Sequence, residues 1–186
     1  KMVPTFSLPG HVRFNDALDE GARGKLRPVT VGPQDVAFLQ YTGGTTGVAK
    51  GAMLTHRNLV SNVLPLEAWV QPALTDTTRG PVPEQLIYIC ALPLYHVFAL
   101  TVNCLGGIRL GTLNVLITNP RDMKGFVAEL AKYRFNVLPG VNTLFNTLAE
   151  NADFQKLDFS SMRISNGGGM AVQQAVAEKW LKLNAD

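Results

Sequence analysis

The chain of 186 residues is 46% hydrophobic and 17% charged, which is enough to bury one substantial core and too little for two ordinary domains. Its 17 basic and 14 acidic residues give a net charge of +3 and include no run of five like charges. The sequence therefore does not predict a nucleic-acid-binding or polybasic membrane-binding surface. The mild basic excess suits a small polyanion.

The first residues predict whether the chain is a fragment, and its cysteines predict the cellular compartment. The first residue is Lys1 rather than Met, and a segment with Pro and Gly follows through Gly10 without the pattern of a signal peptide. We therefore expect an internal fragment of a longer protein, with a lead-in segment at 1–34 and an α/β core at 35–186. Cys90 and Cys104 lie in apolar stretches without the spacing of a zinc or redox motif, which predicts reduced thiols and a cytoplasmic protein.

Short β-rich apolar runs alternate with longer segments of helical period, which is the pattern of a βαβ architecture. In chain order, we predict a helix at 14–20, strands at 36–41 and 52–54, a helix at 56–70, a strand at 86–91, a helix at 97–105, a strand at 113–117, a helix at 123–133, a strand at 137–138, a helix at 143–150, a strand at 162–165 and a helix at 171–183. The fold class is a doubly wound α/β sheet in α-β-α layers, with ligands beyond the carboxyl ends of its strands.

Local patterns refine these elements. Asp122 and Asn142 precede predicted helices and are expected to cap them. Residues 71–84 are polar and contain three prolines, which predicts an exposed connection. The last helix should bury one apolar stripe, formed by Val172, Val176, Trp180 and Leu183.

Residues 86–105 contain no Asp, Glu, Lys or Arg over 20 positions, which is the length of a transmembrane helix. Pro93, His96 and Asn103 interrupt this stretch, and its first half is richer in β-forming residues than its second. We therefore predict strand, loop and buried helix rather than a membrane span.

The most informative segment is YTGGTTGVAKG, residues 41–51, which follows a predicted strand. Glycine frees the backbone to adopt positive φ, and backbone amides and hydroxyl groups can bind an anion. Lys50 adds a positive charge. The segment predicts a polyphosphate-binding loop formed by Thr42, Gly43, Gly44, Thr45, Thr46, Gly47 and Lys50.

The nucleotide-hydrolase P-loop is the competing interpretation, and it ends in Gly, Lys and then Ser or Thr. This chain has Ala49, Lys50 and Gly51 instead, and the segment after them predicts a strand rather than a helix. We therefore expect a glycine-rich hairpin. An ordinary hairpin turn would explain the glycines but not the three hydroxyl groups and the lysine.

The loop resembles, position by position, the signature of the acyl-adenylate-forming (AMP-binding) superfamily, which includes acyl-CoA synthetases, luciferases and peptide-synthetase adenylation domains. Five further segments resemble the bacterial long-chain fatty acid–CoA ligases, so that the resemblance covers nearly the whole chain. They are GAMLTHRNL (51–59), ALPLYHVFAL (91–100), LITNPRD (116–122), GVNTLFNTL (140–148) and SNGGGM (165–170).

The resemblance implies a two-step reaction that uses ATP, Mg²⁺ and CoA. A fatty acid carboxylate attacks the α-phosphorus of ATP to give acyl-adenylate and pyrophosphate, and the CoA thiol then displaces AMP. In the superfamily the loop holds the β- and γ-phosphates, so Thr42, Thr45, Thr46 and Lys50 inherit that role, with Lys50 as a catalytic residue.

His96 follows a predicted strand and lies where an α/β sheet binds ligands. A lone histidine in an apolar stretch is more often a satisfied core residue, so the sequence pattern alone leaves its role open. The resemblance implies that His96 is a catalytic residue of the acyl pocket, beside the reacting carboxylate. It also implies that Val97, Phe98 and Leu100 form an apolar wall.

Gly167, Gly168 and Gly169 form a predicted βα turn that would let a flat ligand approach the backbone, although a tight turn alone also explains them. The resemblance implies that these glycines and Met170 bind the adenine and the acyl carbonyl. Ala171 stands where relatives commonly have proline.

Alternative interpretations are a fatty acyl-AMP ligase, an aryl-CoA ligase or a non-catalytic binding module. No metal ligand is assigned, because the resemblance implies that the metal and ribose sites and a C-terminal domain follow residue 186. We therefore expect the fragment alone to be inactive. Peripheral association of the parent with the inner membrane and a homodimer are compatible with the sequence.

Overall fold

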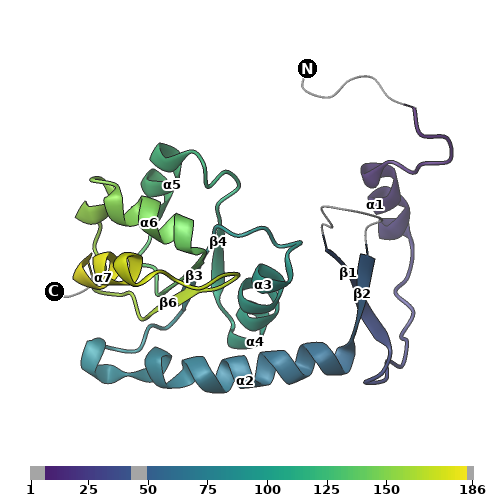
Figure 1. Cartoon of the computed structure of the whole chain (residues 1–186). Coiled ribbons are helices and arrows are strands. Elements are labelled where there is room, and N and C mark those ends of the chain that lie inside the picture. Colours follow the sequence, from purple (N-terminus) through teal and green to yellow (C-terminus); the bar gives the residue numbers. More distant parts are fainter. Residues whose placement is uncertain (1–6, 43–49, 184–186) are drawn as a thin grey trace. The chain divides into compact units, whose positions relative to one another are not determined.

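The computed structural model describes residues 7–42 and 50–183 and divides the chain into two units, residues 1–32 and 33–186 (Figure 1). The first unit contains helix α1 (Phe14–Arg23), which has no buried residue. The second unit contains all the remaining elements described below.

An antiparallel pair of strands, β1 (Val36–Thr42) and β2 (Lys50–Thr55), opens the second unit. Helix α2 (His56–Thr75) follows β2 directly. A capping box fixes its first turn, because the Thr55 hydroxyl accepts from the Asn58 amide at 3.3 Å and the Asn58 side chain accepts from the Thr55 amide at 2.9 Å.

Helix α2 continues five residues beyond the predicted end at residue 70, so the prediction that residues 71–75 belong to an exposed connection is wrong. Pro72 lies inside the helix although proline removes one backbone donor there. Burial of Val70 and Leu74 favours the longer helix. Arg163 also donates to the carbonyls of Ala73 (3.3 Å) and Asp76 (2.6 Å) near the end of the helix.

Four parallel strands form the main sheet, in the order β4-β3-β5-β6. They are β3 (Ile87–Cys90), β4 (Leu113–Leu116), β5 (Val137–Gly140) and β6 (Ile164–Gly167). The strand order changes direction after β4, because β3 lies between β4 and β5. A doubly wound sheet places ligands outside the carboxyl ends of its strands at such a point.

Helices cover both faces of this sheet, so the prediction of a doubly wound α/β fold is confirmed (Figure 1). Their bounds are α3 (Val97–Ala99), the π-helix η2 (Leu100–Leu105), α4 (Gly106–Leu110), α5 (Met123–Leu130), α6 (Asn142–Glu150) and α7 (Gln174–Leu183), with short 3₁₀ turns η1 (Thr77–Arg79) and η3 (Phe154–Lys156).

Side chains alternate between the two faces along each central strand. Ile89 and Leu138 belong to the larger core, which is completed by residues of α5, α6 and α7. Tyr88 and Val137 belong to the opposite core, which is closed by α2. Burial raises the pKa of Tyr88 to about 12, as expected for a phenol that ionises poorly in an apolar environment.

Two local predictions are wrong, and one is confirmed. Asp122 caps α5 by accepting from the Gly125 amide at 3.0 Å. Asn142 does not precede α6 but is its first residue, and its side chain accepts from the Gln173 amide at 2.9 Å. Val172 lies before α7 and is 39% exposed, so the buried stripe does not include it.

Both cysteines are free thiols: Cys90 is buried, and Cys104 is partly buried. Burial raises the pKa of the Cys90 thiol, and the nearby Cys104 adds to this effect. Among the helices within residues 7–42 and 50–183, none is long and apolar enough to cross a membrane.

The core predicts that substitution of two leucines, both in the second half of a helix, will have different effects on stability. Leu148 in α6 is fully buried, whereas Leu181 in α7 is 67% exposed. We expect Leu148→Ala to lower the free energy of unfolding by about 2–5 kcal/mol, because it removes buried apolar surface and leaves a cavity. Leu181→Ala should change it by less than about 1 kcal/mol. Urea denaturation followed by circular dichroism measures both, and equal losses would contradict this core.

Candidate functional site

The predicted phosphate-binding segment lies between the paired strands β1 and β2. Thr42 and Lys50 are register partners and close the intervening loop. The loop residues Gly43, Gly44, Thr45, Thr46 and Gly47 lie outside the described residues. A strand, β2, follows the loop, so the predicted hairpin is confirmed and the helix of a nucleotide-hydrolase P-loop is absent at this position.

Gly51 lies opposite Tyr41 in the β1–β2 register. A Cβ atom at Gly51 would meet the Tyr41 ring at 3.2 Å, which is tighter than an ordinary van der Waals contact. A Ser or Thr, which a P-loop requires here, would have to displace this ring. The cross-strand contact therefore gives a physical reason for the glycine in the sequence.

His96 lies at the surface and caps the helical segment that begins with α3. Its Nδ1 accepts from the Phe98 amide at 3.2 Å. In the neutral imidazole, an accepting Nδ1 places the proton on Nε2. The capping bond orients the ring at the carboxyl end of the sheet, six residues after β3 ends at Cys90.

A hydrogen bond connects the hairpin to the segment that carries His96. Gln40 in β1 donates from Nε2 to the Tyr95 carbonyl at 2.9 Å. Gln40 precedes the loop segment by one residue, and Tyr95 precedes His96. Gln40 was not predicted as a site residue, because a glutamine in a strand carries no pattern that indicates its partner 55 residues away.

A second contact connects the His96 segment to the predicted glycine turn. A Cβ atom at Gly168 would lie only 2.7 Å from the Phe98 ring, so the ring packs directly on the Gly168 backbone. The Gly168 amide in turn donates to the Gly140 carbonyl at 3.1 Å, at the end of β5. The structure thus brings together two predicted groups of residues that are about 70 positions apart in the chain.

Strand β6 ends at Gly167, two residues later than predicted, so Gly167 is not part of the turn, which is shaped by Gly169 and its neighbours. Gly169 has a φ of 78°, which favours glycine because side chains with a Cβ are strained there. Gly167 leaves space for Val172, whose Cγ2 would lie 2.4 Å from an added Cβ. Met170 and Val97 are 57% and 41% exposed, so both side chains are accessible.

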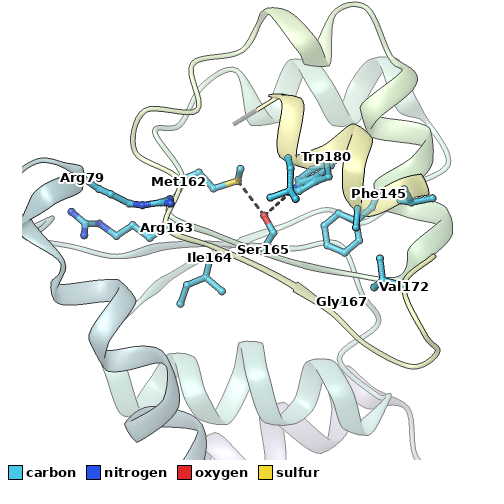
Figure 2. Close-up of a pocket in the computed structure, with 12 residues that line it drawn as sticks. Arg79, Phe145, Met162, Arg163, Ile164, Ser165, Gly167, Val172 and Trp180 are labelled. Carbon is cyan, nitrogen blue, oxygen red and sulfur yellow. Dashed lines mark hydrogen bonds between the residues drawn. The ribbon is translucent and has the colours of Figure 1, made fainter. Parts of the chain in front are cut away.

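A cavity of about 370 Å³ lies between β6 and α7 (Figure 2). Its walls are largely apolar and include Phe145, Val172 and Trp180. Among its polar groups, Ser165 accepts from Trp180 Nε1 at 2.8 Å, and Arg163 donates to main-chain carbonyls. Arg79 also lines the cavity, so its apolar surface is bordered by positive charge.

A second cavity of about 480 Å³ lies at the carboxyl ends of the strands. It is lined by residues that follow β3, β4 and β5, including Leu92, Arg121, Val141 and Leu144. This is the side of the sheet on which His96 and the glycine turn lie. Within the described parts of the chain, no group of three or more His, Cys, Asp or Glu residues could hold a metal ion.

The contact between Phe98 and Gly168 makes a specific prediction. Gly168→Ala should displace the Phe98 ring, because the added Cβ overlaps it, and should lower the free energy of unfolding by about 1–3 kcal/mol. Phe98→Leu in the same chain should recover part of that loss, because the smaller side chain vacates the space. Urea denaturation of the single and double variants measures the coupling, and strictly additive effects would contradict the contact.

The sequence profile of the family described as AMP-binding enzyme matches residues 6–186. Long-chain-fatty-acid–CoA ligases of Escherichia coli O6:H1 and Haemophilus influenzae are 55% and 53% identical over 185 and 184 residues, each covering 98% of this chain and 31% and 32% of those proteins. The crystal structure of ATP-bound MatB from Rhodopseudomonas palustris matches with a TM-score of 0.68 and 26% identity, over 90% of this chain and 31% of that one. The chain thus spans about a third of the length of the curated relatives it matches.

Proposed function

Because the chain belongs to the AMP-binding enzyme family, we propose that it supplies the phosphate loop and part of the acyl site of a longer enzyme, a long-chain fatty acid–CoA ligase. The observation that carries this proposal is the 55% identity to such a ligase over nearly the whole chain. The packing of Phe98 on Gly168 supports it, because it joins the two segments proposed to surround the reacting carboxyl group.

The proposed reaction has two steps. A carboxylate oxygen of the fatty acid attacks the α-phosphorus of ATP, and the bond from that phosphorus to the pyrophosphate oxygen breaks. The thiol sulfur of CoA, after losing its proton, then attacks the acyl carbon, and AMP leaves. Catalysis of such transfers rests mainly on positioning and on stabilising negative charge.

The phosphate loop would stabilise the leaving pyrophosphate. Lys50 begins β2 and pairs in register with Thr42, so the proposed phosphate ligands Thr42, Thr45, Thr46 and Lys50 lie at the ends of a hairpin or between them. The paired strands hold the two ends of the loop together. This supports a site that holds Thr42 and Lys50 on either side of the phosphates, and catalysis of this kind depends on such placement of charge.

The acyl end of the site would be formed by His96, Val97 and the glycine turn. The capping bond to the Phe98 amide orients His96, so that its Nε2–H can donate to a carboxylate oxygen. Val97 would offer apolar surface to the alkyl chain. The backbone of Gly167, Gly168 and Gly169, with Met170, would contact the adenine and the acyl carbonyl.

Mg²⁺ would enter as the complex with the phosphates of ATP, whose charge it partly neutralises. The described residues offer no cluster of metal ligands, so this part of the chain would act on the phosphates through Lys50, the loop hydroxyls and backbone amides. CoA is proposed as the second substrate. The free thiols of Cys90 and Cys104 support a reducing, cytoplasmic setting.

The role of Lys50 can be tested by pyrophosphate exchange in the longer enzyme. Lys50→Ala should slow the fatty-acid-dependent exchange of labelled pyrophosphate into ATP by about 100- to 1,000-fold, because one charge that stabilises the transition state is lost. Fatty acid affinity should change less than about three-fold. Lys25→Ala, an exposed lysine of the first unit, is the control. An unchanged exchange rate in Lys50→Ala would refute the assignment.

We also expect the 186-residue chain alone to produce no acyl-CoA. The chain spans about a third of the length of the curated relatives it matches, and the attraction of one lysine for phosphate is heavily screened by solvent and salt. Purified chain would be incubated with ATP, Mg²⁺, palmitate and CoA, and AMP would be measured by chromatography. Sustained release of AMP that depends on palmitate would show that the essential residues have been misplaced.

A further inference from the structure

The helical segment that carries His96 contains an unusual turn. Leu100–Leu105 forms a π-helix between α3 and α4, and the Gly106 amide donates to the Thr101 carbonyl five residues earlier. Each residue of an α-helix turns the chain by about 100°. An extra residue in one turn therefore changes the rotation of residues 97–99 relative to residues 106–110. Such π-turns occur frequently at functional sites.

Both ends of this segment are held by close packing. At its start, the Phe98 ring lies on the Gly168 backbone. At its end, an added Cβ at Gly106 would lie 3.0 Å from the Leu66 side chain of α2, and one at Gly107 would lie 2.5 Å from the Asn114 side chain. Both ends therefore approach their neighbours closely, and the π-turn sets the rotation of one end relative to the other.

Two asparagines hold the turn. Asn114 on β4 donates from Nδ2 to the Asn103 carbonyl at 3.0 Å. The Asn103 side chain donates from Nδ2 to the Ile89 carbonyl and to Asn114 Oδ1, both at 3.2 Å. The Asn103 carbonyl is thereby hydrogen-bonded to β4, and the Asn103 side chain is hydrogen-bonded to β3.

This arrangement is not optimised for stability. Asn103 is fully buried, and among the described residues its Oδ1 has no hydrogen-bond partner. Burying an unsatisfied oxygen costs free energy, so a leucine of similar size could be tolerated better. A buried polar pair that lowers the free energy of unfolding can still favour one backbone arrangement over the alternatives.

We propose that Asn103 and Asn114 are positioning residues, which hold the π-turn and thereby set the rotation of His96, Val97 and Phe98 toward the acyl substrate. This inference rests on the proposed function. We expect substitution of the two asparagines to change binding of the fatty acid and not of ATP, because the β1–β2 hairpin does not depend on the rotation of this segment. The hairpin contacts the segment at the Tyr95 carbonyl, ahead of the helix.

The test is the double variant Asn103→Leu/Asn114→Val of the longer enzyme, with both single variants. Each single variant leaves the other asparagine side chain without its partner, so it should lower the thermal midpoint. The double variant removes both partners of the bond between the two side chains and should recover part of that loss, although the Ile89 and Asn103 carbonyls still lose a donor. Asn146→Leu in α6, also an Asn-to-Leu change in a helix, is the matched control.

Steady-state kinetics then separate positioning from folding. In the double variant, we expect the KM for palmitate to rise about ten-fold or more, with the order of preference among C8, C12 and C16 acids altered. The KM for ATP should stay within about two-fold of wild type. A double variant with wild-type KM and chain-length preference, or with equal losses for ATP and acid, would overturn the inference. If the wild-type enzyme itself shows no exchange of pyrophosphate that depends on fatty acid, the proposed function fails, and the inference fails with it.

Discussion

The packing of the Phe98 ring on the Gly168 backbone is the contact on which the candidate site depends. It holds the segment after β3 against the turn after β6, although β5 lies between these strands in the sheet. Gln40 adds the hairpin to the same assembly through the Tyr95 carbonyl. Residues 93–98 are therefore the junction of the site: the Tyr95 carbonyl contacts the hairpin, and the Phe98 ring contacts the glycine turn.

Much of the architecture follows from sequence pattern alone. Every predicted strand and helix is present, because hydrophobic period and turn residues were consistent along the chain. The errors arise where a distant residue outweighs local preference. Arg163 reaches back to the carbonyls of Ala73, Asp76, Gly80 and Pro81, and its bonds favour an α2 that continues past Pro72. Asn142 binds Gln173 rather than capping α6, because the segment before α7 offers it an amide.

In the candidate site, too, residues whose partners lie far away in the sequence were not predicted. The loop glycines, threonines and lysine were predicted from their chemistry, whereas the roles of His96 and the glycine turn were predicted through the resemblance to the superfamily, and all of these roles stay predictions. Gln40 and Asn114 were missed, because their partners are set by the sheet and not by neighbours in sequence. Asn103 gave a signal that could have been used: it is a lone amide in an apolar stretch, where an unbonded polar group is costly. Such a residue predicts a buried polar partner, although not which one.

The central claim is that the longer enzyme joins a fatty acid carboxylate to the α-phosphorus of ATP. The most direct measurement uses palmitate labelled with ¹⁸O in both carboxyl oxygens, together with ATP, Mg²⁺ and CoA, and mass spectrometry of the AMP that is released. Attack by the carboxylate places one labelled oxygen on the α-phosphorus, and that oxygen stays with AMP when CoA takes the acyl group. We expect one ¹⁸O per AMP formed. AMP without label, formed together with acyl-CoA, would contradict the account.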